Sequence, residues 1–342
     1  MLTTAAMAGL ASALVPRRRL LGQVPPAASA TPMPLRPPRL QPGDRVGIIS
    51  PAGATLLQRE QDIVTAAIRE LGLVPVLGPH ARDRYGYLAG VDSDRAADVN
   101  QFFADPAIKA LMPIRGDWGS ARILPYLDYG IIRENPKIIV GFSDITALLL
   151  GIYAKTGLIT FHGPHGLTSW AADQTQPFRR VLFDGAAVSI EAVPTSDIST
   201  PARVITPGQA RGPLIGGNLS VISGILGSPY MPNLDGAILV LEDIGEAIYR
   251  IDRMMTQLKL AGALDNLAGF VFGQCTRCAS GDDDGSLTLE QVLRDHLQPL
   301  GIPAWSGAIL GHVEPLLTVP IGIEVTMDAS RGTIQMMQPA VE

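Results

Sequence analysis

The sequence feature that most constrains the fold is an apolar stretch, residues 137–150, that a single glycine divides in two. Before the glycine, Ile138, Ile139 and Val140 form a short uncharged run that predicts a buried strand. After Gly141 the chain resumes an apolar pattern that predicts a helix. Because a strand that turns directly into a helix is a unit of α/β architecture, the segment predicts an α/β fold.

The same alternation recurs along the first half of the chain. Residues 44–50 and 74–77 have the pattern of strands, and residues 58–71 between them have helical spacing. Short apolar strands that alternate with helices as far as Gly166 predict a parallel, Rossmann-like sheet. The nucleophile described below belongs to this half, which we predict as an N-terminal domain at residues 43–175.

A second domain, of the α+β type, is predicted at residues 210–342. Clear periodicity is lost over residues 176–209, which predicts a linker with its centre at 195–201. The paired glycines Gly216 and Gly217 start the second half, where they either approach the site or form a tight turn. Because the candidate residues divide between the halves, we predict the site at the domain interface, where clefts commonly form.

The N-terminal segment, residues 1–42, differs in kind from the rest. Its first part is small, apolar and uncharged, and a Pro- and Ala-rich stretch that contains Arg17, Arg18 and Arg19 follows. This composition predicts a targeting segment, similar to a twin-arginine signal whose basic start is missing and whose start codon lies upstream. The protein is then expected in the periplasm or cell envelope. The alternative is a disordered extension of a cytoplasmic enzyme.

Ser143 follows the strand and its turn, and it is the candidate nucleophile. A serine on a sharp strand-to-helix turn stands clear of the sheet, with its hydroxyl at the positive end of a helix, where a developing oxyanion is stabilised. On this segment alone, a helix N-cap is the better interpretation, because serine is a favoured capping residue. Catalysis requires in addition a base, and a third group that orients the base.

Among the five histidines, His312 is the candidate base. It follows an apolar run that ends in Gly311, the position from which α/β sheets present functional groups, although a lone histidine is more often structural. His162 and His165 come just after the nucleophile helix and are expected to line the site. His296 lies in a charged helical pattern, which predicts a solvated side chain.

A carboxylate to orient the histidine is expected at the end of the apolar run 236–241, which predicts a strand covered on both faces. Both Glu242 and Asp243 stand there, and spacing alone does not decide between them. The structural alternative for Glu242 is a salt bridge to Arg250 or Arg253 in the helix that follows.

A third strand-like run, residues 110–114, ends in a glycine-flanked turn at residues 115–119. Backbone N–H groups in such a loop form one half of an oxyanion hole, and the N–H of Asp144 forms the other. Gly116 is the predicted donor. A phosphate-binding loop is a weak alternative, because the dinucleotide fingerprint and the P-loop sequence are both absent.

Composition narrows the function classes. The chain has 342 residues, of which 46% are hydrophobic and 17% charged, as in a soluble enzyme of two ordinary domains. The net charge of −5 and the absence of a basic stripe predict no nucleic-acid partner. No run in the body of the chain approaches the roughly 18 apolar residues of a membrane span.

Two further motifs stand apart from the candidate site. Cys275 and Cys278 lack the second ligand pair of a zinc ribbon and do not open the first helix of a thioredoxin-like unit. A disulfide in an exported protein and a pair of incidental thiols both remain open. Asp282, Asp283 and Asp284 do not satisfy the spacing of a calcium loop and predict a solvated loop.

Six motifs occur in an order that carries a family resemblance: residues 115–119, 121–128, 141–144, 241–243, 249–253 and 311–312. With them, the chain resembles the LD-carboxypeptidase family of serine peptidases, typified by muramoyltetrapeptide carboxypeptidase. The resemblance runs from about Gly43 to about Gly322. It implies a Ser-Glu-His triad of Ser143, Glu242 and His312, and so favours Glu242 over Asp243. It also implies a homodimer, with no metal and no other cofactor.

The resemblance further implies a substrate and a mechanism. The substrate is a small muropeptide, from which the enzyme removes the terminal D-alanine that follows the L-centre of diaminopimelate. The mechanism is acyl transfer, in which Ser143 attacks and His312 acts as general base and then as general acid. Glu242 holds the imidazole tautomer and stabilises the imidazolium.

The chain departs from the family in the loop at 115–119. The family usually has Arg-Gly-Gly-Tyr-Gly, whereas Asp117 and Trp118 here replace Gly-Tyr. We expect this difference to affect substrate scope more than the oxyanion donor. Arg115 is the candidate for binding the free carboxylate of the substrate, because a bidentate guanidinium suits that task.

Two other functions remain as alternatives. Relatives that confer resistance to microcin-type peptide-nucleotide antibiotics keep the triad and cleave a different amide. A nucleotide-stacking aromatic residue would mark that class, and Trp118 or Trp170 could supply it. The second alternative is a non-catalytic envelope protein that binds muropeptides.

Overall fold

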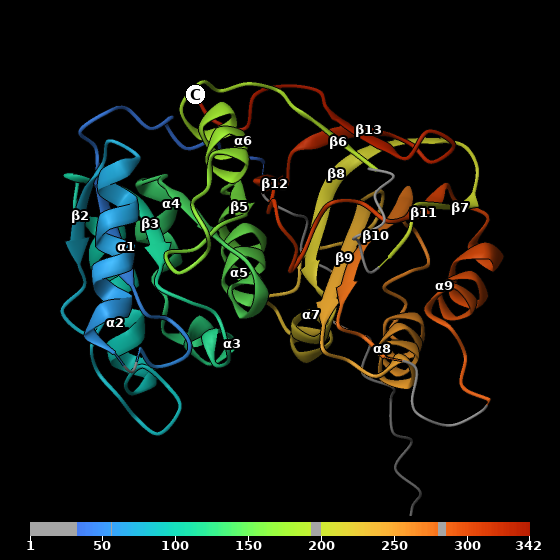
Figure 1. Cartoon of the computed structure of the whole chain (residues 1–342), viewed down its shortest axis with the longest axis horizontal. Helices are drawn as coiled ribbons and strands as arrows, with labels where there is room; N and C mark the ends of the chain where they lie inside the picture. Colours follow the sequence, from blue (N-terminus) through green and yellow to red (C-terminus); the bar gives the residue numbers. More distant parts are fainter. Residues whose placement is uncertain (1–32, 56, 193–199, 280–284) are drawn as a thin grey trace, which may run out of the picture. The chain divides into compact units, whose positions relative to one another are not determined.

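The computed structural model of the chain describes residues 33–55, 57–192, 200–279 and 285–342, which form two β-sheets and the helices around them (Figure 1). The predicted leader lies outside the described residues as far as residue 32. So do Asp282 to Asp284 and most of the predicted linker centre. The fold begins before residue 43, because Leu35 bridges to Leu158 and the side chain of Leu40 is buried.

The first sheet has the strand order β12-β5-β4-β3-β1-β2. Its five strands from the N-terminal half are parallel, which confirms the predicted Rossmann-like sheet. These strands are β1 (Arg45–Ile49), β2 (Val74–Leu77), β3 (Ile108–Pro113), β4 (Ile138–Gly141) and β5 (Thr160–His162). The sixth strand, β12 (Val319–Ile321), comes from far along the chain and pairs antiparallel with β5.

Short connections and helices link these strands. The helical elements of this half are α1 (Gln58–Glu70), α2 (Asp92–Ala104), α3 (Ser120–Ile123), η1 (Leu124–Tyr126), α4 (Tyr129–Glu134), η2 (Ser143–Ile145) and α5 (Thr146–Thr156). Helix α5 is buried along nearly its whole length, with contacts to β5 on one side and to the second sheet on the other. A helix that is apolar on all sides must be covered on all sides, which explains the unbroken apolar run after the nucleophile turn.

The second sheet has the strand order β6-β14-β13-β8-β9-β10-β11-β7 and a parallel centre. The central strands are β8 (Gln209–Asn218), β9 (Ile238–Ile244), β10 (Gly269–Thr276) and β11 (Ala304–Ser306). The outer strands, which pair antiparallel, are β6 (Ser189–Glu191), β7 (Arg203–Thr206), β13 (Glu324–Asp328) and β14 (Thr333–Met336). The remaining helical elements are α6 (Ala172–Leu182), α7 (Leu219–Ile225), α8 (Ile248–Leu260), α9 (Leu289–Leu297) and η3 (Gln298–Leu300).

The segment predicted as a linker, residues 176–209, is largely regular in its described part. It contains the second half of α6 and the strands β6 and β7. Strands of three or four residues are too short to show a period, which is why the sequence pattern does not reveal them. The paired glycines form no tight turn, because Gly216 and Gly217 lie inside β8.

At Gly217 the second sheet comes close to the nucleophile helix. A Cβ at this position would lie 2.7 Å from the side chain of Thr146, the first residue of α5. The N–H of Asn218 also donates to the Thr146 hydroxyl, at 3.1 Å. Glycine is therefore required where β8 passes the start of α5.

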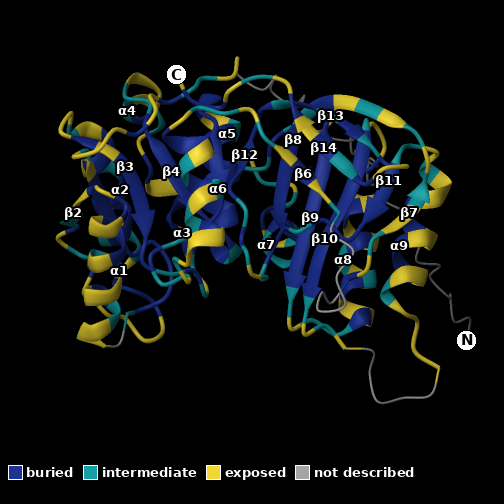
Figure 2. Cartoon of the chain, turned by 45° about the horizontal axis from the view of Figure 1, so that its top comes forward, coloured by how far each residue is buried: buried dark blue, intermediate teal, exposed yellow. Residues whose placement is uncertain are grey.

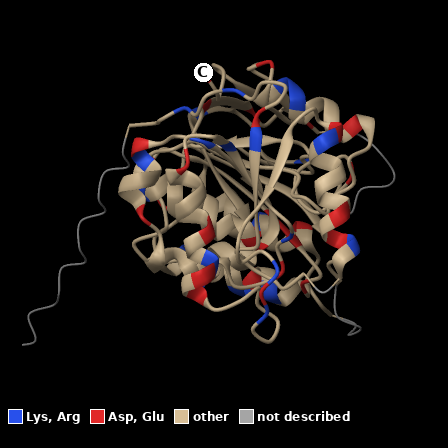
Figure 3. Ribbon diagram, turned by 90° about the vertical axis from the view of Figure 1, so that its left-hand side faces the viewer, with Lys and Arg blue, Asp and Glu red and all other residues tan. Residues whose placement is uncertain are grey.

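Burial and charge follow this architecture. The central strands of both sheets are buried, whereas the exposed residues lie on helices, loops and the outer strands (Figure 2). In the view of Figure 3, acidic and basic residues are mixed along the helices and loops. None of the described helices has both the length and the apolar character needed to cross a bilayer.

Candidate active site

Ser143 lies on the sharp turn between β4 and α5. Its φ of +60° is in the left-handed region, which residues other than glycine rarely adopt. Residues that do adopt it occur most often at functional sites. The N-cap residues of η2 and α5 are Phe142 and Ile145, and neither cap involves a side-chain hydrogen bond. The capping interpretation of Ser143 is therefore wrong, because the helical turn starts at the serine itself.

The glycine loop after β3 lies directly against this turn. A Cβ on Gly116 would be 3.2 Å from Ser143 Cβ and 3.3 Å from the backbone nitrogen of Asp144. Glycine at position 116 therefore lets one backbone approach the other. The predicted oxyanion-hole residues Gly116 and Asp144 thus lie together beside the serine.

The side chain of Asp144 joins the same two segments. Its Oδ2 accepts a hydrogen bond from the N–H of Ser120 at 2.7 Å, and its carbonyl accepts one from the Ser120 hydroxyl. Burial raises the pKa of Asp144, and the Ser120 hydrogen bonds oppose that shift. The carboxylate therefore ties the start of α3 to the serine turn. We did not predict this role of Asp144 from the sequence.

His312 and Glu242 form a hydrogen-bonded pair. His312 Nδ1 lies 2.8 Å from Glu242 Oε2, and the glutamate is fully buried while 15% of the His312 side chain is exposed. Gly311 makes the approach possible, since a Cβ there would lie 2.6 Å from Glu242 Oε2, and its φ is +112°. The other carboxylate oxygen of Glu242 is buried and has no hydrogen-bond partner in the described part of the chain.

Asp243 points away from this pair and serves the structure. Its carboxylate accepts hydrogen bonds from the hydroxyl and the N–H of Ser220, at 2.7 and 3.0 Å, and from Asn218 Nδ2 at 3.2 Å. Burial raises the pKa of Asp243 to about 6. The suggested salt bridge from Glu242 is not what the structure holds, because Arg250 pairs with Glu246 at 3.7 Å.

Phe142 brings the serine turn and the histidine loop together. Its ring lies 4.9 Å from the His312 ring and is stacked at 4.7 Å on the ring of His165. The ring of His162 is 6.2 Å away. Burial lowers the pKa of His162 to about 4 and that of His165 to about 3, so both are neutral at pH 7. Sequence patterns do not predict this aromatic contact, because it depends on tertiary packing.

The candidate substrate-binding residues lie on the same glycine loop. Arg115 pairs with the Asp117 carboxylate, with Nε–Oδ2 at 2.6 Å, and its Nη1 lies 3.5 Å from Glu60. Asp117 has a φ of +75°, a strained value for a residue with a side chain. Trp118 is 65% exposed and makes an edge contact with Tyr87, which is equally exposed.

Two sequence interpretations need correction. His296 is not solvated, because α9 packs on α8, where His296 is buried and its Nε2 lies 2.6 Å from Asp252 Oδ1. His312 does not follow its strand directly, since β11 ends at Ser306 and a loop carries the histidine. Helix packing and strand ends both depend on partners that a local pattern does not show.

Outside the Ser143, Glu242 and His312 region, the described residues include a linked cysteine pair and a cluster of possible metal ligands. Cys275 and Cys278 form a disulfide, which decides between the two interpretations left open. Among the described residues, His80, Asp83 and Asp94 place possible ligand atoms within 4.8 Å of one another. His80 already pairs with Asp83 at 2.7 Å, and we assign this cluster no role.

The fold and the site together define a class. A two-sheet α/β fold with a serine on a strained strand-to-helix turn, whose neighbour Phe142 lies against the histidine of a His–Glu pair, is typical of hydrolytic enzymes. Two family descriptions match the chain: "LD-carboxypeptidase N-terminal domain" at residues 46–163 and "LD-carboxypeptidase C-terminal domain" at residues 211–327. The chain belongs to the LD-carboxypeptidase family, and it is an enzyme of the carboxypeptidase type.

Named relatives agree with this assignment. The chain is 38% identical to "Probable murein peptide carboxypeptidase" of Bacillus subtilis, over 87% of this chain and 93% of the relative. It is 31% identical to the microcin C7 self-immunity protein MccF of Escherichia coli, over 89% of this chain and 96% of that protein. The solved structure of MccF in complex with glutamyl sulfamoyl guanosine matches with a TM-score of 0.80 and 28% identity, over 90% of this chain and 100% of the other.

Proposed function

We propose that the protein is a serine LD-carboxypeptidase that removes the terminal D-alanine from murein tetrapeptides, in peptidoglycan recycling or remodelling. The observation that carries the proposal is the His312–Glu242 hydrogen bond of 2.8 Å, in a loop whose histidine ring packs on Phe142, the neighbour of Ser143. A nucleophile, a base and an orienting carboxylate are the parts that acyl transfer requires.

In the proposed mechanism each group has a defined role. Because Nδ1 of His312 is bound to Glu242, its Nε2 is the nitrogen that takes the Ser143 proton as the hydroxyl attacks the scissile carbonyl. Glu242 stabilises the imidazolium that forms, and the imidazolium then protonates the D-alanine amine as it leaves. The same base activates the water that hydrolyses the acyl-enzyme.

The tetrahedral intermediate needs donors for its oxyanion. We assign this role to the backbone N–H groups of Gly116 and Asp144, and the close approach of the Gly116 loop to the serine turn supports the assignment. Such donors are fixed before the reaction, so they stabilise the developing charge without reorganisation.

Arg115 is our candidate for holding the terminal carboxylate of the substrate. It lies next to Gly116, and its guanidinium provides a bidentate donor pair. The carboxylate of Asp117 is paired with that guanidinium, so Arg115 can bind the substrate only when the Arg115–Asp117 ion pair opens. Asp117 is therefore expected to weaken binding and to narrow substrate scope, compared with relatives that have glycine there.

A peptide-nucleotide substrate is the second candidate function, and one observation favours it. Trp118 is part of the glycine loop and has a largely exposed ring, on which a base could stack. Trp170 is less suited, because its ring packs edge-on against Phe178 at 5.1 Å. The sequence relatives named for murein peptides and the one named for microcin immunity both cover most of this chain, so substrate choice is a matter for experiment.

The test is incubation of the purified protein, without residues 1–32, with disaccharide-tetrapeptide and separately with an aminoacyl sulfamoyl nucleotide. Mass spectrometry follows D-alanine release from the first and amide cleavage of the second. We expect D-alanine release, with a loss of roughly a thousandfold or more in Ser143→Ala and none in the surface control Ser286→Ala. Cleavage of the nucleotide alone would favour the second candidate, and cleavage of neither would favour a muropeptide-binding protein.

We also propose that the leader-like segment directs export to the periplasm or envelope, and that the enzyme is a homodimer. The composition of residues 1–42 supports export, and the family resemblance supports the dimer. Fractionation of cells that express the complete gene tests the first proposal. Light scattering of the purified protein tests the second.

A further inference from the structure

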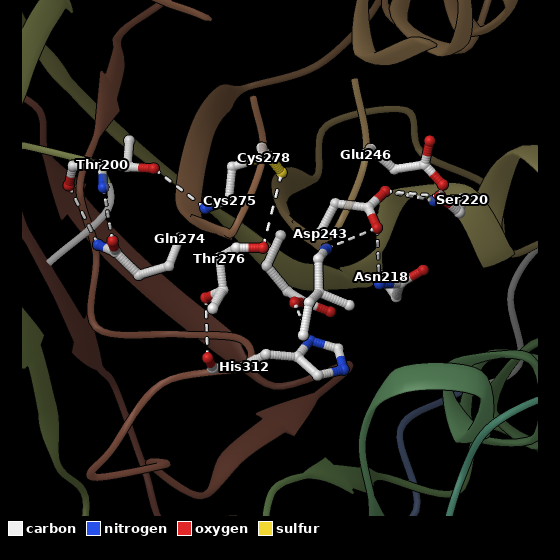
Figure 4. Close-up of a disulfide and its surroundings, with 12 residues drawn as sticks. Thr200, Asn218, Ser220, Asp243, Glu246, Gln274, Cys275, Thr276, Cys278 and His312 are labelled. Carbon is white, nitrogen blue, oxygen red and sulfur yellow. Dashed lines mark hydrogen bonds and ion pairs between the residues drawn. A yellow bond between two sulfur atoms is a disulfide. The ribbon is translucent and has the colours of Figure 1, made fainter. Parts of the chain in front are cut away.

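The Cys275–Cys278 disulfide lies beside the candidate active site (Figure 4). Cys275 is buried near the end of β10, where it is in register with Asp243 on β9. The residue before Asp243 is Glu242, the partner of His312. The disulfide therefore closes a short turn at the same end of the sheet from which the carboxylate of the pair comes.

Thr276, which the disulfide encloses, connects this turn to the histidine. Its hydroxyl donates a hydrogen bond to the backbone carbonyl of His312, at 2.8 Å (Figure 4). Its own carbonyl accepts a hydrogen bond from the N–H of Gly245, also at 2.8 Å. One residue thus links the histidine loop to the segment that follows the β9 strand.

The turn around Thr276 is not one that an unlinked chain would favour. Arg277, between the two cysteines, has a φ of +54° and an exposed side chain, so it occupies a left-handed conformation without glycine. A strained backbone conformation persists where the surrounding structure enforces it. Here the crosslink between Cys275 and Cys278 encloses Arg277 and holds it in this conformation. Opening the crosslink would allow the turn to relax and the threonine to move.

We propose that Thr276 is a positioning residue for His312, and that the Cys275–Cys278 disulfide holds it in place, so that turnover depends on the redox state of this pair. The inference rests on the proposed function, because it assigns His312 the role of base. Neither the family resemblance nor the sequence motifs assign a role to the cysteines.

The redox step is an ordinary thiol–disulfide exchange with a dithiol reductant. The reductant thiolate attacks the sulfur of Cys278, which is partly exposed, while Cys275 is only 2% exposed. The S–S bond breaks, Cys275 leaves as a thiolate and takes a proton, and a mixed disulfide forms on Cys278. The second thiol of the reductant then displaces Cys278, which gives two protein thiols and one oxidised reductant.

The first test compares Thr276→Val, which removes the hydroxyl, with Thr276→Ser, which keeps it. We expect kcat for D-alanine release to fall about tenfold in Thr276→Val with KM changed less, and to recover in Thr276→Ser. Thr206→Val is the matched control, because the Thr206 hydroxyl is buried without a hydrogen-bond partner among the described residues. A Thr276→Val enzyme with the kcat and pH profile of the wild type would overturn the positioning role.

The second test reduces the wild type with dithiothreitol and counts the released thiols. We expect kcat to fall by the factor seen for Thr276→Val and to return on reoxidation. The double variant Cys275→Ala with Cys278→Ala is expected to show the lowered kcat with no response to the reductant. Full activity in wild type that carries two free thiols would overturn the redox part.

A readout without substrate separates this inference from the proposed function. The imidazole ¹³Cε1 resonance of His312, assigned by its loss in His312→Gln, is recorded by NMR at one fixed pH. We expect its chemical shift to change in Thr276→Val and in reduced wild type, and to be unchanged in Thr276→Ser and Thr206→Val. A changed His312 resonance without D-alanine release would contradict the proposed substrate but support the positioning role of Thr276. D-alanine release with an unchanged resonance would contradict the positioning role but support the proposed function.

Discussion

His162 is predicted to make the protein lose stability in acid, by an amount that can be worked out. The residue ends β5 behind the candidate site, it is 1% exposed, and its ring nitrogens have no hydrogen-bond partner in the described part of the chain. Burial lowers its pKa from 6.5 to about 4, while the charge of Glu242 opposes this shift. Between about pH 6.5 and pH 4, His162 therefore binds a proton in the unfolded chain but not in the native protein.

The direction in which stability changes with pH follows from this difference in proton uptake. The contribution of His162 to the free energy of unfolding is complete above pH 6.5 and is lost as the pH falls toward about 4. With these two pKa values, the loss between pH 7 and pH 5 is about 2 kcal/mol. His162→Gln cannot titrate, so its stability should fall by that much less over the same interval.

The assay is urea unfolding of wild type and His162→Gln at several pH values, followed by tryptophan fluorescence or circular dichroism. His80→Gln is a control of opposite sign. A hydrogen bond to Asp83 raises the pKa of His80, so its contribution is present below pH 6.5 and is lost as the pH rises. Parallel stability curves for wild type and His162→Gln across pH 5 to 7 would show that burial of His162 does not make the protein acid-sensitive.

Three further predictions concern the site. Glu242→Gln is expected to lower kcat roughly a thousandfold or more, whereas Asp243→Asn mainly lowers the melting temperature. Steady-state kinetics and calorimetry compare the two variants, and an equal loss of kcat in both would contradict the assignment of Glu242 as the partner of His312. Gly116→Ala, whose Cβ would lie 3.2 Å from Ser143 Cβ, should push the two loops apart and lower kcat roughly a hundredfold at similar KM, and an unchanged kcat would show that catalysis does not need this close approach. Asp117→Gly relieves a φ of +75° and releases Arg115, so KM for the tetrapeptide should fall, and a rise would remove Arg115 as the carboxylate ligand.

The strand, turn and helix around Ser143 could be predicted because the information is local. An apolar strand, a glycine and an apolar helix occupy consecutive positions, and the structure has β4, η2 and α5 there. The same holds for β1, α1 and β2, whose predicted limits lie within a residue of the observed ones. Local patterns also placed Gly116 and Glu242 near strand ends, and in the structure Gly116 follows β3 after a short gap while Glu242 lies in the last part of β9.

The rest depended on contacts between distant segments. Spacing could not choose between Glu242 and Asp243, because only the position of His312 shows which carboxylate faces it. The strand β12 joins a sheet built from residues far earlier in the chain, which no local pattern predicts. His296 was misplaced for the same reason, since its charged neighbours in sequence say nothing about the packing of α9 on α8.

The most direct test of the central claim is to identify the residue that carries the acyl group during turnover. The enzyme is mixed with disaccharide-tetrapeptide and quenched in acid within milliseconds, and its peptides are mapped by mass spectrometry. We predict that the disaccharide-tripeptide acyl group is found on Ser143, and that Ser143→Ala neither carries it nor releases D-alanine. An acyl group on another residue, or release of D-alanine by Ser143→Ala at the wild-type rate, would contradict it.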